Sequence, residues 1–119
     1  MQDLGVTIFH NQRCSKSRET LSILEEQGVS PEMVLYLETP PDADQLKAIL
    51  GKLGGINARE LLRKGEQEFM DNNLGDSSLT EEQLIDFMCQ FPKLIERPIV
   101  INGEKARICR PPESVLEIL

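Results

Sequence analysis

Cys14 lies in the run HNQRCSKSR, residues 10–18, between a short apolar stretch and a segment with helical periodicity. A cysteine at the first turn of a helix meets unpaired backbone N–H groups and a partial positive charge, and both stabilise a thiolate. A free thiol titrates near pH ~8.5, so about 3% is ionised at pH 7, and a shift to about 6.5 raises that fraction roughly twentyfold. Arg13, Lys16 and Arg18 add positive charge nearby. The run therefore predicts that Cys14 is a reactive nucleophile.

Cys14 and Ser17 form a C-x-x-S pattern, which has no second cysteine to resolve a disulfide within the motif. Because nothing local restores the thiolate, an outside thiol must do so. Two roles are open for Ser17: it caps or packs, or its hydroxyl donates to the thiolate or to a bound oxyanion. His10, four residues before the cysteine, is either a partly buried imidazole or a cation or donor that lowers the thiol pKa.

The other two cysteines, Cys89 and Cys109, are expected to serve packing. Cys89 falls on an amphipathic segment, and Cys109 ends a strand-like run beside Arg110. Three widely spaced cysteines do not indicate a disulfide framework. One histidine without close Cys/His pairs also argues against a zinc site. We therefore expect no metal site.

The chain has 119 residues, a net charge of −7 and 28% charged residues. This length predicts one domain, residues 1–119, with a core of its own. The acidic balance argues against a general nucleic-acid binder, although a local cationic cluster can still hold an anion. No apolar run approaches the ~20 residues of a membrane span, and the N-terminal residues lack a secretory signal pattern. We therefore expect a cytoplasmic protein without a membrane or nucleic-acid partner.

The elements that position Cys14 follow from periodicity. Residues 6–9 form a short strand, a helix runs from about 15 to 27 and ends at Gly28, and the apolar run 33–37 is a second strand. This order predicts parallel strands joined by a right-handed crossover.

The middle of the chain is helical. Asp42 is the expected N-cap of a helix whose inner face carries Leu46, Ile49, Leu50 and Leu53. Shorter helices are expected over 58–64 and within 66–72, and Thr80 with Gln83 fits a capping box that opens another. This stretch covers about residues 42–92.

The C-terminal part returns to strands. Residues 99–101 and 106–109 flank the turn signal Asn102-Gly103, and Pro111-Pro112 starts a last helix. The whole order is β-α-β, a helical stretch, then β-β-α. This α/β pattern, with cysteine at the first strand–helix junction, resembles the thioredoxin/glutaredoxin-like mixed sheet, here with a helical insertion between its two halves.

Six ordered motifs carry a narrower resemblance, which runs from about residue 6 to 119. They are His10-Asn11-x-x-Cys14-x-x-Ser17-Arg18, Tyr36-Leu37-Glu38-Thr39-Pro40-Pro41, Glu60-Leu61-Leu62-Arg63-Lys64, Leu84-Ile85-Asp86-Phe87-Met88, Glu96-Arg97-Pro98-Ile99-Val100 and Cys109-Arg110-Pro111. Together they resemble the glutaredoxin-dependent arsenate reductase family.

The resemblance implies a thiol-dependent oxidoreductase. Cys14 would attack arsenate, glutathione would react with the enzyme-bound arsenic, and glutaredoxin would complete reduction to arsenite. Glutathione is then a co-substrate, and no tightly bound cofactor is expected. The family's anion-binding arginines fall on Arg63, Arg97 and Arg110, and its histidine falls on His10.

Thioredoxin-like folds place a cis-proline beside the active cysteine, so the Arg97–Pro98 bond is predicted to be cis. Arginine suits an oxyanion because its planar fork matches oxyanion geometry and keeps its charge. Two departures from the family pattern stand out. Gln12 replaces the usual proline, which loosens the loop through backbone entropy, and the extra residue in Gly54-Gly55 makes Arg59 the alternative to Arg63.

Other functions remain open at this stage. One is a glutaredoxin-like thiol-transfer enzyme with another substrate, which has no need of three converging arginines. Another is a redox-related regulatory binding protein, similar to regulators that contact RNA polymerase; those carry C-x-x-C, whereas position 17 here is serine. A third is an inactive family member, which an ordinary Cys14 pKa would favour.

Overall fold

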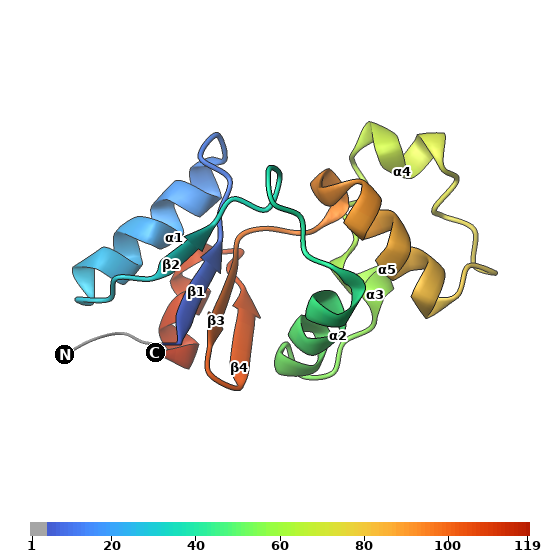
Figure 1. The fold of residues 1–119 in the computed structure, drawn as a ribbon. Helices are drawn as coiled ribbons and strands as arrows, with labels where there is room; N and C mark the ends of the chain where they lie inside the picture. The colour runs from blue at the N-terminus through green and yellow to red at the C-terminus, as the bar shows by residue number, and fades with distance from the viewer. Residues whose placement is uncertain (1–4) are drawn as a thin grey trace.

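The structure is a computed structural model, and it describes residues 5–119. Its centre is a four-stranded mixed sheet in the order β2-β1-β3-β4 (Figure 1). The strands are β1 (Val6–Phe9), β2 (Glu32–Val34), β3 (Ile99–Asn102) and β4 (Lys105–Ile108). β1 pairs in parallel with β2 and antiparallel with β3, which pairs antiparallel with β4. The predicted α/β mixed sheet is confirmed.

The second strand is shorter than its sequence indicates. The apolar run predicts a strand over 33–37, yet β2 ends at Val34 because the Leu35 carbonyl accepts the N–H groups of Glu38 and Thr39 in a turn. This turn directs Tyr36 into the core, where it is 1% exposed and its ring stacks on Phe9. The run is apolar because it enters the core, not because all of it is a strand.

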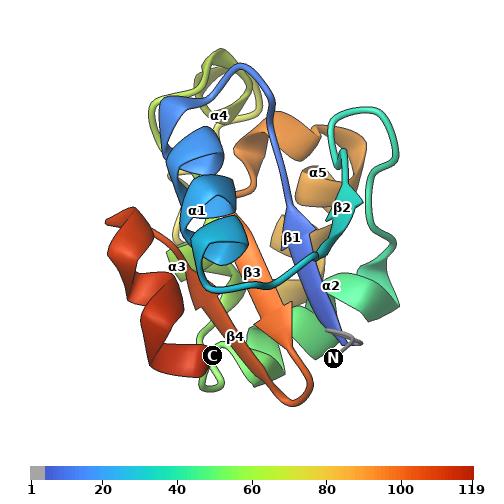
Figure 2. The ribbon, with the colours of Figure 1, turned by 90° about the vertical axis from the view of Figure 1, so that its left-hand side faces the viewer.

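One face of the sheet is covered by α1 (Ser15–Glu26) and η2 (Pro112–Ile118), as Figure 2 shows. α1 ends as predicted, with Gly28 at φ +78°. The last element is a 3₁₀ helix rather than the α-helix that the sequence predicts. Its opening N–H, from Ser114, bonds the Pro111 carbonyl three residues back, which is the hydrogen-bond pattern of a 3₁₀ helix.

Helices from the middle of the chain lie on the other side of the sheet. These are α2 (Ala43–Lys52), α3 (Ala58–Leu61), α4 (Gln67–Asp71), α5 (Glu81–Gln90) and the 3₁₀ turn η1 (Pro92–Leu94). α2 packs on β4, whereas α4 lies farthest from the sheet in Figure 1. The predicted caps are present, because Asp42 and Thr80 each form a capping box. None of the helices within residues 5–119 is long and apolar enough to cross a membrane.

α3 is shorter than the predicted helix over 58–64. Leu62 leaves the helix and forms an isolated antiparallel bridge with Ile95, and the Arg63 N–H donates to the Leu94 carbonyl at 2.7 Å. This contact holds Arg63 against the segment that leads into β3, more than thirty residues further along the chain.

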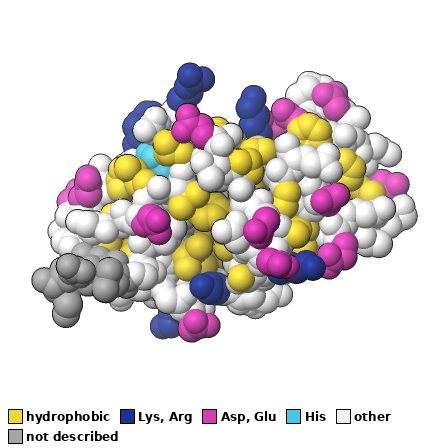
Figure 3. All heavy atoms as spheres, in the orientation of Figure 1, with side chains coloured by type: hydrophobic (Ala, Val, Ile, Leu, Met, Phe, Trp, Pro, Cys, Tyr) yellow, Lys and Arg dark blue, Asp and Glu magenta, His cyan; other side chains and the backbone are white. Residues whose placement is uncertain are grey.

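Strand directions bring distant segments to one edge of the sheet. β1 and β2 are parallel, so both end there; β3 runs the opposite way and begins there, and β4 ends there. The loop before α1, the turn after β2, the Arg97–Pro98 segment and Arg110 therefore meet at the upper edge in Figure 1. Figure 3 shows cationic side chains standing on this edge near His10.

Candidate functional site

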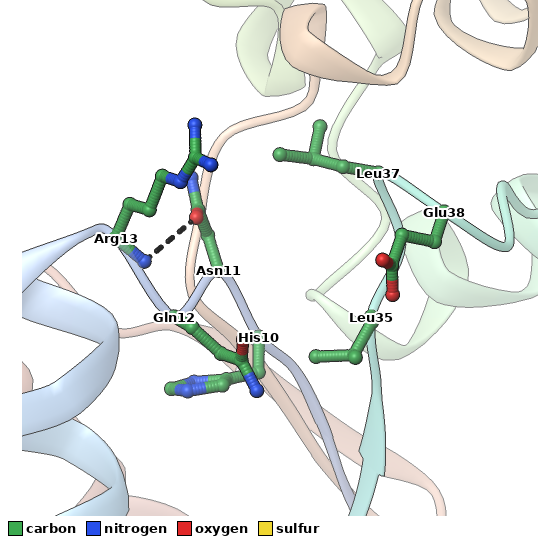
Figure 4. A pocket seen from close by; sticks show the side chains of 7 residues that line it. All are labelled: His10, Asn11, Gln12, Arg13, Leu35, Leu37 and Glu38. Atoms are coloured by element: carbon green, nitrogen blue, oxygen red, sulfur yellow. Dashed lines mark hydrogen bonds between the residues drawn. The ribbon is translucent and has the colours of Figure 1, made fainter.

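The loop between β1 and α1 is shaped by Asn11. Its side-chain oxygen accepts the Arg13 N–H at 3.0 Å, and its carbonyl accepts the Cys14 N–H at 3.0 Å. The first of these bonds is the dashed line in Figure 4. Such an Asx turn reverses the chain tightly, and it delivers Cys14 to the N-cap position of α1.

Arg18 braces the same loop from α1. Its Nη1 donates to the Gln12 carbonyl at 3.0 Å. The fully buried Ser17 adds a second tie, since its hydroxyl oxygen accepts the Asn11 N–H at 3.4 Å. These bonds hold a loop in which Gln12 stands where the family usually has proline.

Cys14 is 8% exposed and caps α1 with an extended backbone. Burial is the largest single influence on its pKa and raises it. The opposing influences are the N–H of Ser17, the positive charge of Arg97, and the N–H of Lys16 with the Ser17 hydroxyl. They prevail, so the pKa of the Cys14 thiol lies below its ordinary value. The Cys14 side chain makes no capping hydrogen bond, which leaves these donors available to a thiolate or a bound anion.

The surroundings of the other two thiols raise their pKa values instead of lowering them. Burial raises the pKa of Cys109 to about 12, and its sulfur donates weakly to the Arg107 carbonyl at 3.6 Å. Burial, together with nearby carboxylates, also raises the pKa of Cys89. All three cysteines are free. Cys14 is therefore the thiol suited to nucleophilic attack.

Arg97 carries an unusual pair of atoms. Its Nε and Nη1 are buried, and neither has a hydrogen-bond partner within residues 5–119. Buried guanidinium N–H groups normally find an acceptor. The reactive group that Arg97 influences is the Cys14 thiol, whose pKa it lowers. The Arg97–Pro98 bond is cis, as predicted, and so is the bond between Arg110 and Pro111.

Arg110 lies next to Arg97 at the same edge. It is exposed, and its Nη1 donates to the Arg97 carbonyl at 3.3 Å. The structure thus brings two of the three arginines that the resemblance implies into direct contact, with the side chain of Arg110 still open to solvent.

Arg63 approaches from the α3 side. Its Nη1 lies 3.0 Å from a carboxylate oxygen of Glu66, and its Nε lies 3.5 Å from one of Glu96. The alternative, Arg59, donates instead to the carbonyls of Leu74 and Asp76 at 2.8 and 3.0 Å. Its guanidinium therefore holds a loop away from the cysteine, which favours Arg63 as the third cation at this edge.

Tyr36 is a further polar group near Cys14, to which the sequence analysis gives no role. Its pKa is raised to about 12, with burial as the main cause. Arg97 and Arg63 oppose this rise, whereas the charges of Cys14 and Glu66 add to it. The Tyr36 hydroxyl thus lies among the same groups as the cysteine and stays protonated at any working pH. The sequence did not point to Tyr36 because this residue lies in the turn after β2, where the apolar pattern predicts a strand.

His10 is 4% exposed, and its Nδ1 has no hydrogen-bond partner within the described residues. Burial, and then the charge of Arg18, lowers the pKa of His10, so the imidazole is neutral at pH 7. A cationic His10 beside the thiol therefore receives no support, and a donor role stays a prediction. His10 lines a cleft of about 260 Å³ between the Cys14 loop and the turn after β2 (Figure 4).

The assembled groups suit a tetrahedral anion attacked by a thiolate. One thiol with a lowered pKa lies beside backbone donors, an unpartnered guanidinium and a protonated phenol. Within residues 5–119 there is no cluster of three or more His, Cys, Asp or Glu side chains that could hold a metal ion. Fold and site together define a thioredoxin-like thiol protein.

Comparison with known proteins narrows this class. A sequence model of the ArsC family matches residues 9–118. The chain is 60% identical to the uncharacterized protein YfgD of Escherichia coli K12, covering 96% of each chain. It is 45% identical to the arsenate reductase of Haemophilus influenzae, covering 98% of this chain and 100% of the relative. A solved structure of arsenate reductase from Vibrio cholerae superposes with a TM-score of 0.93 at 50% identity, covering 96% and 97%. The protein belongs to the ArsC family.

Proposed function

We propose that this protein reduces arsenate to arsenite with thiols as the reductant, and that Cys14 is the nucleophile. The observation that carries the proposal is the pair of buried, unpartnered nitrogens of Arg97 beside a cysteine of lowered pKa. Buried guanidinium N–H groups without acceptors are costly, and an oxyanion bound beside the thiolate would supply those acceptors. The relatives named arsenate reductase, in E. coli and H. influenzae, support the same substrate.

The electron balance requires two thiols for each arsenate. Written out, H₂AsO₄⁻ and two RSH give H₂AsO₃⁻, RSSR and water, and arsenic passes from As(V) to As(III). The Cys14 thiolate first displaces one arsenate oxygen, which leaves as water, so an As–S bond forms without change of oxidation state. A second thiol, glutathione in this proposal, then supplies the other sulfur of the disulfide, and arsenic keeps the electron pair.

Each positively polarised group has a part in the first step. Arg97 donates to the equatorial oxygens, which carry growing charge as the As–S bond forms. Arg63 and Arg110 add charge, and the Tyr36 hydroxyl donates a hydrogen bond. The N–H groups of α1 hold the thiolate until attack. With no resolving cysteine in C-x-x-S, glutathione and glutaredoxin regenerate Cys14.

The thiol-transfer alternative shares Cys14 but does not explain the free guanidinium. A coupled assay with NADPH, glutathione, glutaredoxin and arsenate tests the proposal, with Cys14→Ser as the control. We expect arsenate-dependent NADPH oxidation that Cys14→Ser abolishes and that phosphate inhibits competitively. Turnover that survives Cys14→Ser would reject arsenate reduction by this thiol, as would a wild-type protein that adds no arsenate-dependent rate to the glutaredoxin background.

A further inference from the structure

The thiol that regenerates Cys14 needs a route to a sulfur that is 8% exposed. Arg97, Arg63 and Arg110 occupy the side where the oxyanion binds. A cleft of about 260 Å³ adjoins the loop that carries this cysteine, because residues 10–13, immediately before Cys14, form one of its walls. This volume lies just under the ~300–1,000 Å³ of small-molecule sites, which suits a ligand no larger than a short peptide.

The two walls of the cleft carry opposite charges. Arg13 stands on the loop before Cys14, and Glu38 stands on the turn after β2, with Leu35 and Leu37 beside it. Figure 4 shows Leu35, Leu37 and Glu38 pointing across the cleft toward the loop that carries Arg13. Both charged residues are exposed, and neither side chain forms an ion pair within residues 5–119. The charges are therefore free to bind a ligand that has both signs.

His10 also lines the cleft. The residue is 4% exposed, and its Nδ1 is closed off from the surface and lacks a partner among the described residues. In Figure 4 the imidazole ring points toward α1 and away from Leu35, Leu37 and Glu38. His10 therefore shapes the wall of the cleft, and ligand binding there depends on the charged side chains.

We propose that this cleft binds the peptide of the reducing thiol, a tripeptide with a carboxylate at one end and an ammonium at the other, as in glutathione. Glu38 takes the ammonium of the γ-glutamyl end, Arg13 on the opposite wall takes the glycine carboxylate, and Leu37 packs on the backbone between them. The inference rests on the proposed function only for the identity of the reductant. Its exchange step needs no arsenate.

The step itself is a thiol–disulfide exchange. The glutathione thiolate attacks the Cys14 sulfur of a mixed disulfide, a new S–S bond joins the two sulfurs, and the former partner leaves as a thiolate. A second glutathione then attacks the glutathione sulfur, which releases the Cys14 thiolate and oxidised glutathione. Held in the cleft, the peptide would bring its sulfur to Cys14 along the loop of residues 10–13.

The test uses the full-length protein with Cys14 blocked as a mixed disulfide with thionitrobenzoate, and follows release of that coloured thiolate. Three thiols are compared: glutathione, its glycine ethyl ester and 2-mercaptoethanol, whose rate corrects for changes in Cys14 itself. The variants are Arg13→Gln and Glu38→Gln. Matched controls are Arg107→Gln and Glu82→Gln, which remove the same exposed charges from ion pairs elsewhere.

We expect Arg13→Gln to slow the reaction with glutathione about fivefold relative to the reaction with 2-mercaptoethanol. The substitution should also erase the preference for glutathione over its ester. Glu38→Gln is the sharper variant. Long-range electrostatics alone predict that removing the negative charge of Glu38 speeds the reaction with anionic glutathione. Loss of the contact between Glu38 and the glutathione ammonium instead slows that reaction, again about fivefold. The controls should leave all three rates unchanged.

A Glu38→Gln protein that reacts with glutathione at the same rate or faster would overturn the proposal. So would an Arg13→Gln protein that keeps the wild-type preference for glutathione over its ester. Failure of the wild type to reduce arsenate would instead reject the proposed function, and would leave the exchange rates and their interpretation standing.

Discussion

Arg97 offers a prediction in which stability and function change in opposite directions. Its Nε and Nη1 are buried without partners within residues 5–119, and an unsatisfied buried polar group costs about 1–3 kcal/mol. The side chain is only half-buried, so we take the lower end, about 1 kcal/mol. For a chain of this size that is about 3–6 °C in Tm. Arg97→Met should therefore raise Tm by about that amount in anion-free buffer.

The same substitution should weaken anion binding. A charge-assisted contact through the guanidinium contributes about 1.5–3 kcal/mol, which is about 10- to 100-fold in Kd. At an arsenate concentration 100 times its Kd, the wild type gains about 2.7 kcal/mol of stability. At that concentration Arg97→Met gains only about 0.4–1.4 kcal/mol by the same relation. The pKa of Cys14 should rise as well, since Arg97 lowers it.

The assay is thermal unfolding with and without arsenate, or phosphate as a non-reducible probe. Arg59→Met is the matched control, because Arg59 donates to two backbone carbonyls. Losing those bonds should lower Tm by about 5 °C or more and leave the anion-induced shift intact. If Arg97→Met unfolds several degrees below the wild type, or keeps the full anion-induced shift, then Arg97 is a structural residue and the site has been misassigned.

Three further predictions concern single residues of the site. Iodoacetamide should alkylate Cys14 faster at neutral pH than an unperturbed thiol because the pKa of Cys14 is lowered, while Cys89 and Cys109, whose pKa values are raised, react far more slowly in the folded protein; mass spectrometry of Cys14→Ser checks the assignment. Tyr36→Phe should keep Tm within about 3 °C but raise the Kd for phosphate about threefold to tenfold, since one neutral donor is lost; an unchanged Kd, measured by calorimetry, would limit Tyr36 to packing. His10 has a lowered folded-state pKa, so its contribution to stability is present above the unfolded value near 6.5 and is lost as pH falls below it; His10→Asn should flatten denaturant-derived stability between about pH 6.5 and 5, and an unaltered slope would contradict a buried neutral imidazole.

Much of the fold could be predicted because local patterns were consistent. The capping boxes at Asp42 and Thr80 depend on residues three positions apart, so the sequence displays them directly. Gly28 likewise marks the end of α1 by its positive φ. The parallel pairing of β1 with β2 and the β3–β4 hairpin follow from these elements, whereas the sequence did not predict the antiparallel pairing of β1 with β3 that joins the two halves.

The errors arose where tertiary contacts override local preference. The run 33–37 is apolar enough for a strand, but the turn at Leu35 ends β2 and buries Tyr36. The last helix is 3₁₀ where it packs on α1 and β4. Neither outcome can be read from periodicity, since both depend on what the segment packs against.

The sequence alone determined the chemistry that is available: a thiol at a helix N-terminus, no resolving cysteine within C-x-x-S, and arginines scattered from position 63 to 110. Helix ends and motif spacings are local, so they survive in the one-dimensional pattern. Only the tertiary structure decided which arginine lacks partners. Arg59 donates to two backbone carbonyls and Arg63 pairs with two carboxylates, whereas Arg97 keeps two buried nitrogens without a partner within residues 5–119. Desolvation and pairing depend on neighbours distant in the chain, and these set the pKa of Cys14 and leave Arg97 without a partner.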